Sequence, residues 1–149
     1  MRRNLIIALI VVLFVSTYAI FRTKFFKNNQ QNFFNLFENS SEQDIINAIN
    51  AGADINVRDS HNNTVLMLAA IYSNHNVVKA LIDAGTDVND RRVDGATALF
   101  VASALSTYDV IKSLINAGAD VNAKDKNGST ALMNAALTNK SDIVKLLIN

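Results

Sequence analysis

Apolar residues from about residue 31 to the C-terminus recur with a period of 33 residues, and each period contains two apolar stretches. The first stretch is short and begins with a threonine, at 64–70, 97–103 and 130–136. The second is longer; Val77, Val78, Leu81 and Ile82 show its helical spacing, which places them on one buried face. A fixed period of this size indicates a solenoid, in which one small unit is stacked several times.

Polar residues punctuate each period at the points where helices are expected to begin and end. A threonine hydroxyl can accept a hydrogen bond from the free N–H groups of a first helical turn, so Thr64, Thr97 and Thr130 are predicted N-caps. Glycine adopts left-handed backbone conformations without steric cost. Gly85 is therefore predicted to end the second helix of its unit, and the polar run that follows is predicted to form a turn.

The repeated residues resemble those of the ankyrin repeat family. The unit nearest the C-terminus carries most of the family pattern, in Asp125, Gly128, Thr130, Leu132, Ala135, Ala136, Ile143, Val144, Lys145, Leu146, Leu147 and Ile148. The resemblance implies an all-α solenoid of stacked helix-turn-helix units with short β-hairpin-like turns. It also implies protein binding as the role, without enzymatic activity.

Some positions depart from the family pattern. The family proline and histidine are replaced in all three clear units, by Val65, Ala98 and Ala131 and by Met67, Phe100 and Met133. Asn62 stands in place of a turn glycine, which is a mild change because asparagine tolerates the left-handed region. Arg92 replaces the aspartate that opens the turn in the other units.

A degenerate unit precedes the three clear ones. One period before the clear units, the first helix falls on Phe33, Phe34 and Phe37, and the second falls on residues 44–49 with Ser41 as its cap. Terminal repeats are often atypical because they cover the end of the core, so we interpret these aromatic residues as a packed cap. At the other end, we expect either that residues 146–148 are left partly exposed or that the fourth unit acts as a minimal cap.

The N-terminal segment predicts a membrane anchor. Residues 5–21 form a run of 17 uncharged, mostly apolar residues, which as a helix is about 25 Å long. We therefore divide the chain into a signal anchor or transmembrane helix at 1–27 and an ankyrin repeat domain at 28–149. The repeats are placed at about 28–56, 57–89, 90–122 and 123–149.

A signal peptide removed after Ala19 is the alternative to an uncleaved anchor. Basic residues flank the run on both sides, so the positive-inside rule does not set the orientation. The short basic N-terminal tail resembles an export signal and favours a repeat domain outside the cytoplasm. Cleavage would instead make the chain secreted or periplasmic.

Charge and composition exclude several functions. The first 27 residues hold 5 basic and no acidic side chains, whereas the remainder holds 9 basic and 13 acidic ones, which argues against a nucleic acid partner. The chain has no cysteine, and its histidines, His61 and His75, have no cysteine beside them, so a zinc site is not expected. No catalytic, cofactor-binding or metal-binding constellation is predicted, nor a small-molecule substrate.

The resemblance places partner contacts on the tips of the turns and on the exposed face of each first helix. In this sequence those positions are Ser60, His61, Asn63, Ile71, Tyr72, Arg91, Arg92, Val93, Asp94, Leu105, Lys126, Asn127, Leu137 and Thr138. Ile71, Tyr72, Leu105 and Leu137 suggest an apolar stripe across three units. The sequence leaves open whether they contact a partner or pack against the neighbouring repeat.

The function expected from the sequence is a membrane-anchored protein–protein interaction module that presents a concave ankyrin surface to a partner protein. Two alternatives remain open. One is an exported soluble binder or inhibitor, formed if the signal is cleaved. The other is an accessory subunit of a membrane enzyme, although residues 5–21 offer few small residues for helix packing.

Overall fold

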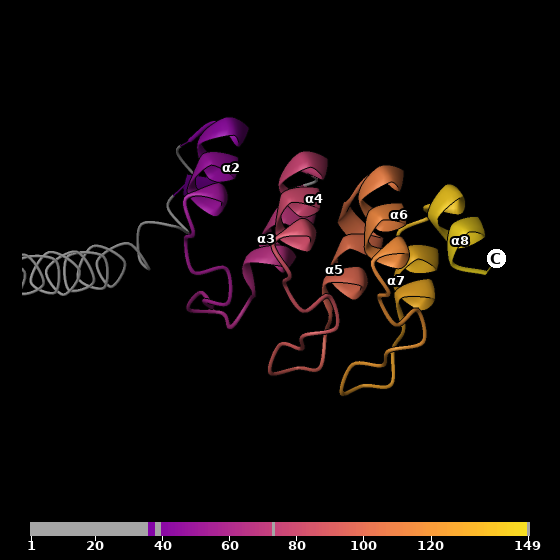
Figure 1. Cartoon of the computed structure of the whole chain (residues 1–149). Helices are drawn as coiled ribbons and strands as arrows, with labels where there is room; N and C mark the ends of the chain where they lie inside the picture. The colour runs from indigo at the N-terminus through magenta and orange to yellow at the C-terminus, as the bar shows by residue number, and fades with distance from the viewer. Residues whose placement is uncertain (1–35, 38–39, 73, 149) are drawn as a thin grey trace, which may run out of the picture.

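The computed structural model describes residues 36–37, 40–72 and 74–148, and these residues form a stack of helix pairs (Figure 1). The helices are α2 (Glu42–Asn50), α3 (Val65–Ile71), α4 (His75–Asp83), α5 (Ala98–Leu105), α6 (Tyr108–Asn116), α7 (Ala131–Leu137) and α8 (Ser141–Ile148). Helices α3, α5 and α7 pack side by side and form what we call the first-helix layer. Helices α2, α4, α6 and α8 form the second-helix layer, which packs against it.

Three loops project from the same side of the stack (Figure 1). We call them the first finger (51–64), the second finger (84–97) and the third finger (117–130). Each links a helix of the second-helix layer to the next helix of the first-helix layer. The hairpin-like character expected of these loops is slight: within the described residues, regular β pairing is confined to one bridge between Arg58 and Thr64.

The threonine caps predicted from the sequence are confirmed in all three first-layer helices. Each hydroxyl accepts a hydrogen bond from the N–H three residues later: Thr64 from Met67 at 3.1 Å, Thr97 from Phe100 at 3.2 Å and Thr130 from Met133 at 3.4 Å. These bonds satisfy one of the N–H groups that a helix start leaves free. They also locate the start of each first-layer helix at the end of a finger.

The predicted cap at the start of α2 and the predicted glycine after α4 are confirmed. Ser41 and Asp44 form a reciprocal capping box at the start of α2. Gly52, Gly85 and Gly118 follow α2, α4 and α6 with φ values of 83°, 86° and 88°. This left-handed conformation turns the chain from the helix into the finger, and glycine reaches it without strain.

The core lies between the two layers and is made of aliphatic side chains. Leu66 and Leu99 from the first-helix layer and Leu81 and Leu114 from the second are all at most 1% exposed. Small residues such as Ala69 and Ala102 are fully buried where neighbouring helices approach. One unit alone cannot cover such an apolar face, so the units stabilise one another by stacking.

The two ends of the stack differ from its middle. Leu36 and Phe37 are partly buried and pack against the core, as expected of a capping unit. Phe33 and Phe34, assigned to the same cap, lie outside the described residues. At the other end, Leu146 and Leu147 are partly exposed and Ile148 is 67% exposed, which agrees with the expectation from the sequence.

The predicted signal anchor at 1–27 also lies outside the described residues. None of the helices in the described part of the chain combines the length and hydrophobicity that a membrane-spanning segment requires.

Candidate partner-binding surface

Aspartate side chains organise the first and third fingers in the same way. The Asp59 carboxylate accepts hydrogen bonds from the N–H groups of His61 at 2.9 Å and Asn63 at 2.7 Å. Two periods later, the Asp125 carboxylate accepts hydrogen bonds from the N–H groups of Asn127 at 2.9 Å and Ser129 at 2.8 Å. A carboxylate that binds its own loop in this way holds the turn in one conformation.

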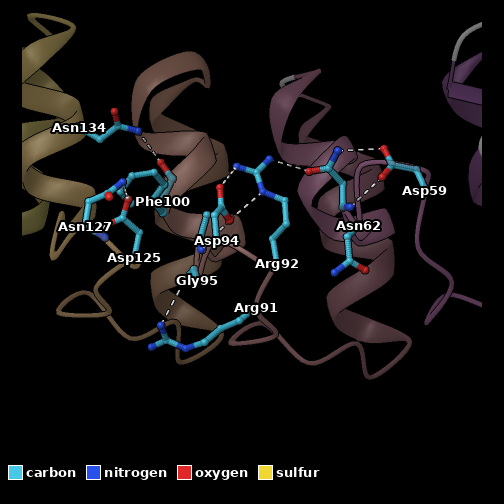
Figure 2. Close-up of polar contacts among 12 residues, drawn as sticks. Asp59, Asn62, Arg91, Arg92, Asp94, Gly95, Phe100, Asp125, Asn127 and Asn134 are labelled. Carbon is cyan, nitrogen blue, oxygen red and sulfur yellow. Dashed lines mark hydrogen bonds and ion pairs between the residues drawn. The ribbon is translucent and has the colours of Figure 1, made fainter.

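The second finger has Arg92 in place of that aspartate, and an arginine cannot accept these bonds. Asp94 supplies the missing acceptor: its carboxylate accepts from the Ala96 N–H at 3.2 Å and pairs with the Arg92 guanidinium at 2.9 and 2.5 Å. Arg92 Nη1 also donates to Asn63 Oδ1 at 2.9 Å. Figure 2 shows the guanidinium lying between its own finger and the first one. The substitution therefore exchanges a local turn contact for a bridge between fingers.

These contacts shift the ionisation of the groups involved. The hydrogen bond from Arg92 lowers the pKa of Asp94 to about 2, and the pKa of Arg92 is raised in return. Burial raises the pKa of Asp59, but hydrogen bonds from Asn63 and His61 outweigh burial, so this pKa lies below its ordinary value. The carboxylates of Asp59 and Asp94 are therefore ionised at neutral pH.

A second set of bonds between fingers uses the basic residue that recurs at 58, 91 and 124. Arg58 Nη1 donates to the backbone carbonyl of Arg91 at 3.2 Å, and Arg91 Nη1 donates to that of Lys124 at 2.8 Å. Arg58 also pairs with Asp90 at 2.5 Å. Each arginine thus binds the backbone of the equivalent residue one repeat later, which fixes the spacing of the fingers.

The predicted finger residues consequently divide into two groups. Asn63 is buried and Arg92 is partly buried, and both are held in the network just described, so Asn63 does not contribute to the accessible surface. Arg91 and Asp94 are exposed, but each is bonded within or between fingers. The remaining members are exposed at the finger tips: Ser60, His61, Val93, Lys126 and Asn127.

The apolar positions at the ends of the first-layer helices are the more informative ones. Tyr72 is 55% exposed, Leu105 is 59% exposed and Leu137 is 84% exposed. We call these three residues, which come from three adjacent helices, the apolar strip. Ile71 differs from them because it is partly buried and packs against the core. Thr138 is exposed, but its hydroxyl donates back to carbonyls of its own helix.

The helices that carry the apolar strip are uncharged, although the Lys140 ammonium binds the Ser106 carbonyl next to Leu105. Helices α3, α5 and α7 contain no Asp, Glu, Lys or Arg. The Tyr72 ring stacks on Phe37 with 6.2 Å between ring centroids, which supports it from one side. In the second-helix layer, by contrast, the exposed ring of Tyr108 has the ammonium of Lys112 6.0 Å from its centroid. An aromatic side chain without such polar cover is more suited to contact another protein.

The described residues contain no candidate metal site. No group of three or more His, Asp or Glu side chains gathers there in a way that could hold a metal ion. What the surface offers is an apolar strip at the C-terminal ends of the first-layer helices and, where these helices begin, a row of fingers that are hydrogen-bonded to one another.

Several bonds between repeats were not predicted from the sequence. They come from Arg58, Asn89, Asn134 and Lys140. Asn134, for example, donates to the Phe100 carbonyl in the preceding unit at 2.9 Å. The recurrence of a basic residue at 58, 91 and 124 is a signal that points to the arginine bridges. Asn89 also recurs, as Asn56 and Asn122, whereas Asn134 and Lys140 have no equivalent in the earlier units.

Comparison with known proteins agrees with the architecture. The family model for ankyrin repeats (3 copies) matches residues 36–125 and 104–149, so the two matches together span the whole stack. No curated protein matches the sequence significantly.

Proposed function

We propose that this chain, which belongs to the ankyrin repeat family and is therefore a protein–protein interaction module, binds its partner protein through the apolar strip. Ankyrin repeat proteins typically bind other proteins and make or break no covalent bond. The observation that carries the proposal is the large exposure of Tyr72, Leu105 and Leu137 within a layer that has no charged residue.

The physical basis of binding is burial of apolar area by a surface that is already ordered. Burial of apolar area contributes about 25 cal/mol per Å². More of this free energy remains as binding affinity when the repeat protein loses little conformational freedom on binding. The capped helices and the bonds between fingers supply that rigidity. Tyrosine is a frequent hot-spot residue. Tyr72 is the main residue of the proposal because its ring is stacked on Phe37.

A photo-activatable cross-linking residue at Leu105 would test the assignment in cells that express the full chain. We expect an adduct with a partner protein from this position and none from Lys112, which is exposed on the second-helix layer. Equal or stronger cross-linking from Lys112 would place the binding face on the second-helix layer and contradict the proposal.

A second-site substitution makes this test quantitative. Tyr72→Asp should reduce the Leu105 adduct about tenfold or more, because a hot-spot residue contributes about 2 kcal/mol. Tyr108→Asp is the matched control, since Tyr108 is an exposed tyrosine of the other layer. It should leave the adduct unchanged. A similar loss in both variants would mean that the effect is not specific to the strip.

We further propose that residues 5–21 anchor the repeats at a membrane, with the repeat domain outside the cytoplasm. The support is the uncharged run of 17 residues with basic residues on both sides. A reporter that is active only outside the cytoplasm, fused after Asn149, tests the orientation, and sequencing the mature N-terminus tests cleavage. A silent reporter would place the repeats in the cytoplasm. An active reporter on a chain that starts near Ile20 would favour an exported binder without an anchor.

A further inference from the structure

Two of the three basic residues that recur along the fingers are arginines, and they differ in their partners. The Arg58 guanidinium pairs with Asp90 of the next finger at 2.5 Å. One period after Asp90 the chain has Ala123, which is buried and carries no charge. Arg91 therefore finds no carboxylate at the equivalent position of the third finger, where its Nη1 donates to the Lys124 carbonyl at 2.8 Å. Within the described residues, Arg91 forms no ion pair.

The Arg91 guanidinium is held in place but keeps part of its hydrogen-bonding capacity. Nη1 makes both of its bonds, to the carbonyls of Gly95 at 3.2 Å and Lys124 at 2.8 Å. Nε and Nη2, which form one edge of the group, have no hydrogen bond in the described part of the chain. Figure 2 shows the guanidinium beside Gly95 and apart from the Arg92–Asp94 pair. Arg92 uses this same edge to bind the Asp94 carboxylate through two bonds, so the free edge of Arg91 suits a carboxylate.

Two more cations lie beside Arg91. Lys124 and Lys126 are exposed, and neither side chain forms an ion pair in the part of the chain that the structure describes. The second and third fingers touch at this point, because the Lys126 N–H donates to the Asp94 carbonyl at 2.8 Å. Arg91 lies between these two fingers, so its surroundings are set by residues on both sides. We call Arg91, Lys124 and Lys126 the basic cluster.

The carboxylates around the basic cluster have partners of their own. Asp90 pairs with Arg58, and Asp94 pairs with Arg92. Asp125 accepts hydrogen bonds from N–H groups of its own turn and offsets part of the charge of the two lysines. The cluster thus keeps a net positive charge, although the chain after residue 27 holds more acidic than basic side chains. A local positive field of this kind attracts and orients an anionic ligand.

We infer that the basic cluster binds an acidic segment of the partner protein, with a carboxylate of that segment on the free edge of Arg91. This inference rests on the proposed function, since it describes the same partner. The second finger leads into α5, and Leu105 of the apolar strip lies at the far end of that helix. A helix of 8 residues is about 12 Å long. Protein interfaces of standard size are wider than this, so one partner can cover the basic cluster and the apolar strip together.

A protein segment fits the basic cluster better than an anionic membrane surface does. Asp87 and Asp120 are exposed in the same two fingers, and the Asp94 side chain is 49% exposed. A flat layer of anionic headgroups would meet these carboxylates as well as the cations, and the repulsion would offset the attraction. An acidic segment of a protein can place its carboxylates on the cations alone.

The test measures where an acidic peptide binds to the full chain, purified in a non-ionic detergent. The probe is an N-acetylated hexaglutamate peptide, and a carbodiimide joins its carboxylates to nearby lysine amines as amides. Peptide mapping by mass spectrometry reads each lysine separately, so the basic residues within 1–27 do not enter the comparison. Lys79 and Lys112 are the controls, because both are exposed on the second-helix layer. Reaction with a small neutral acetylating reagent corrects for the intrinsic reactivity of each amine.

We expect Lys124 and Lys126 to couple about fivefold more than the two controls, which is the size of effect that an exposed ion pair provides. Arg91→Gln should remove most of this preference, whereas Arg91→Lys, which keeps the charge but loses the planar fork, should retain part of it. Lys79→Gln is the matched control and should leave the preference unchanged. In about 1 M sodium chloride the Debye length is about 3 Å, so the preference should disappear. Circular dichroism checks that each variant keeps the helical content of the parent.

Equal coupling at all four lysines, or a preference that Arg91→Gln leaves intact, would overturn the inference. It would also be overturned if vesicles that contain phosphatidylserine, but not vesicles of phosphatidylcholine alone, protected Lys124 and Lys126 from acetylation, since the ligand would then be a lipid surface. The probe does not involve the apolar strip, so failure of this test leaves the Leu105 cross-link unaffected. Absence of the Leu105 adduct together with an intact hexaglutamate preference would instead contradict the proposed function alone.

Discussion

The two helix layers of this protein differ in the number of charged residues that they contain. In the second-helix layer, α4, α6 and α8 each contain one aspartate and one lysine, and these face water. In the first-helix layer, α3, α5 and α7 contain none, although their ends are exposed. Exposure to water and charge therefore do not go together in this fold, because the exposed ends of the first-layer helices are uncharged. The layer that shows apolar side chains to water is the one suited to contact another protein.

The largest expected effect compares two leucines on opposite sides of this contrast. Leu114→Ala removes a fully buried side chain and should lower the free energy of unfolding by roughly 2–5 kcal/mol. Leu105→Ala removes a side chain that is 59% exposed and should change it by less than about 0.5 kcal/mol. Urea unfolding followed by circular dichroism measures both. Equal losses of stability would show that Leu105 is part of the core, and this would contradict its assignment to an exposed surface.

A smaller effect separates the N-caps of α5 and α6, the two helices of one unit. The Thr97 hydroxyl accepts a hydrogen bond from the Phe100 N–H, whereas Thr107, at the start of α6, makes no such bond. Thr97→Val keeps the shape of the side chain and should cost about 1 kcal/mol. Thr107→Val should cost less than half as much. The two unfolding midpoints in urea measure this difference, and similar shifts would mean that the Thr97 hydrogen bond does not contribute to stability.

The smallest effect concerns the second finger, which joins the two layers. Because the pKa of Asp94 is about 2 in the folded state and lies below its unfolded value, the carboxylate stabilises the fold above about pH 4. This contribution is lost as the pH falls from about 4 to about 2. It should be below about 1 kcal/mol, since Asp94 is half exposed and screened by water.

Asp94→Asn isolates that contribution. The variant should be less stable than the parent at pH 7, and the difference should shrink toward zero near pH 2. A difference that stays constant over this range would mean that the ionised pair with Arg92 is not its source. Unfolding midpoints at a series of pH values provide the measurement.

The repeat register predicted the positions of many candidate site residues, but it did not predict which of them are exposed to solvent. The repeat register placed Tyr72, Leu105 and Leu137 at the ends of first-layer helices, and the structure locates them there with large exposure. The same register placed Asn63 and Ile71 on the surface, yet Asn63 is buried and Ile71 partly so. Exposure depends on the neighbouring unit, and a single repeat pattern contains no information about how closely that neighbour approaches.

The threonine caps and the glycines at positive φ could be predicted from the sequence because they depend on only a few residues, and the repeat of 33 residues could be predicted because it is visible as a pattern. A cap bond spans three residues and a left-handed turn needs only one, so local chemistry is sufficient for both. The hydrogen bonds between units, in contrast, are visible only in the tertiary structure. The bonds from Arg58 to Arg91 and from Arg92 to Asn63 join residues about one repeat apart, and they exist because stacking brings the fingers within hydrogen-bonding distance.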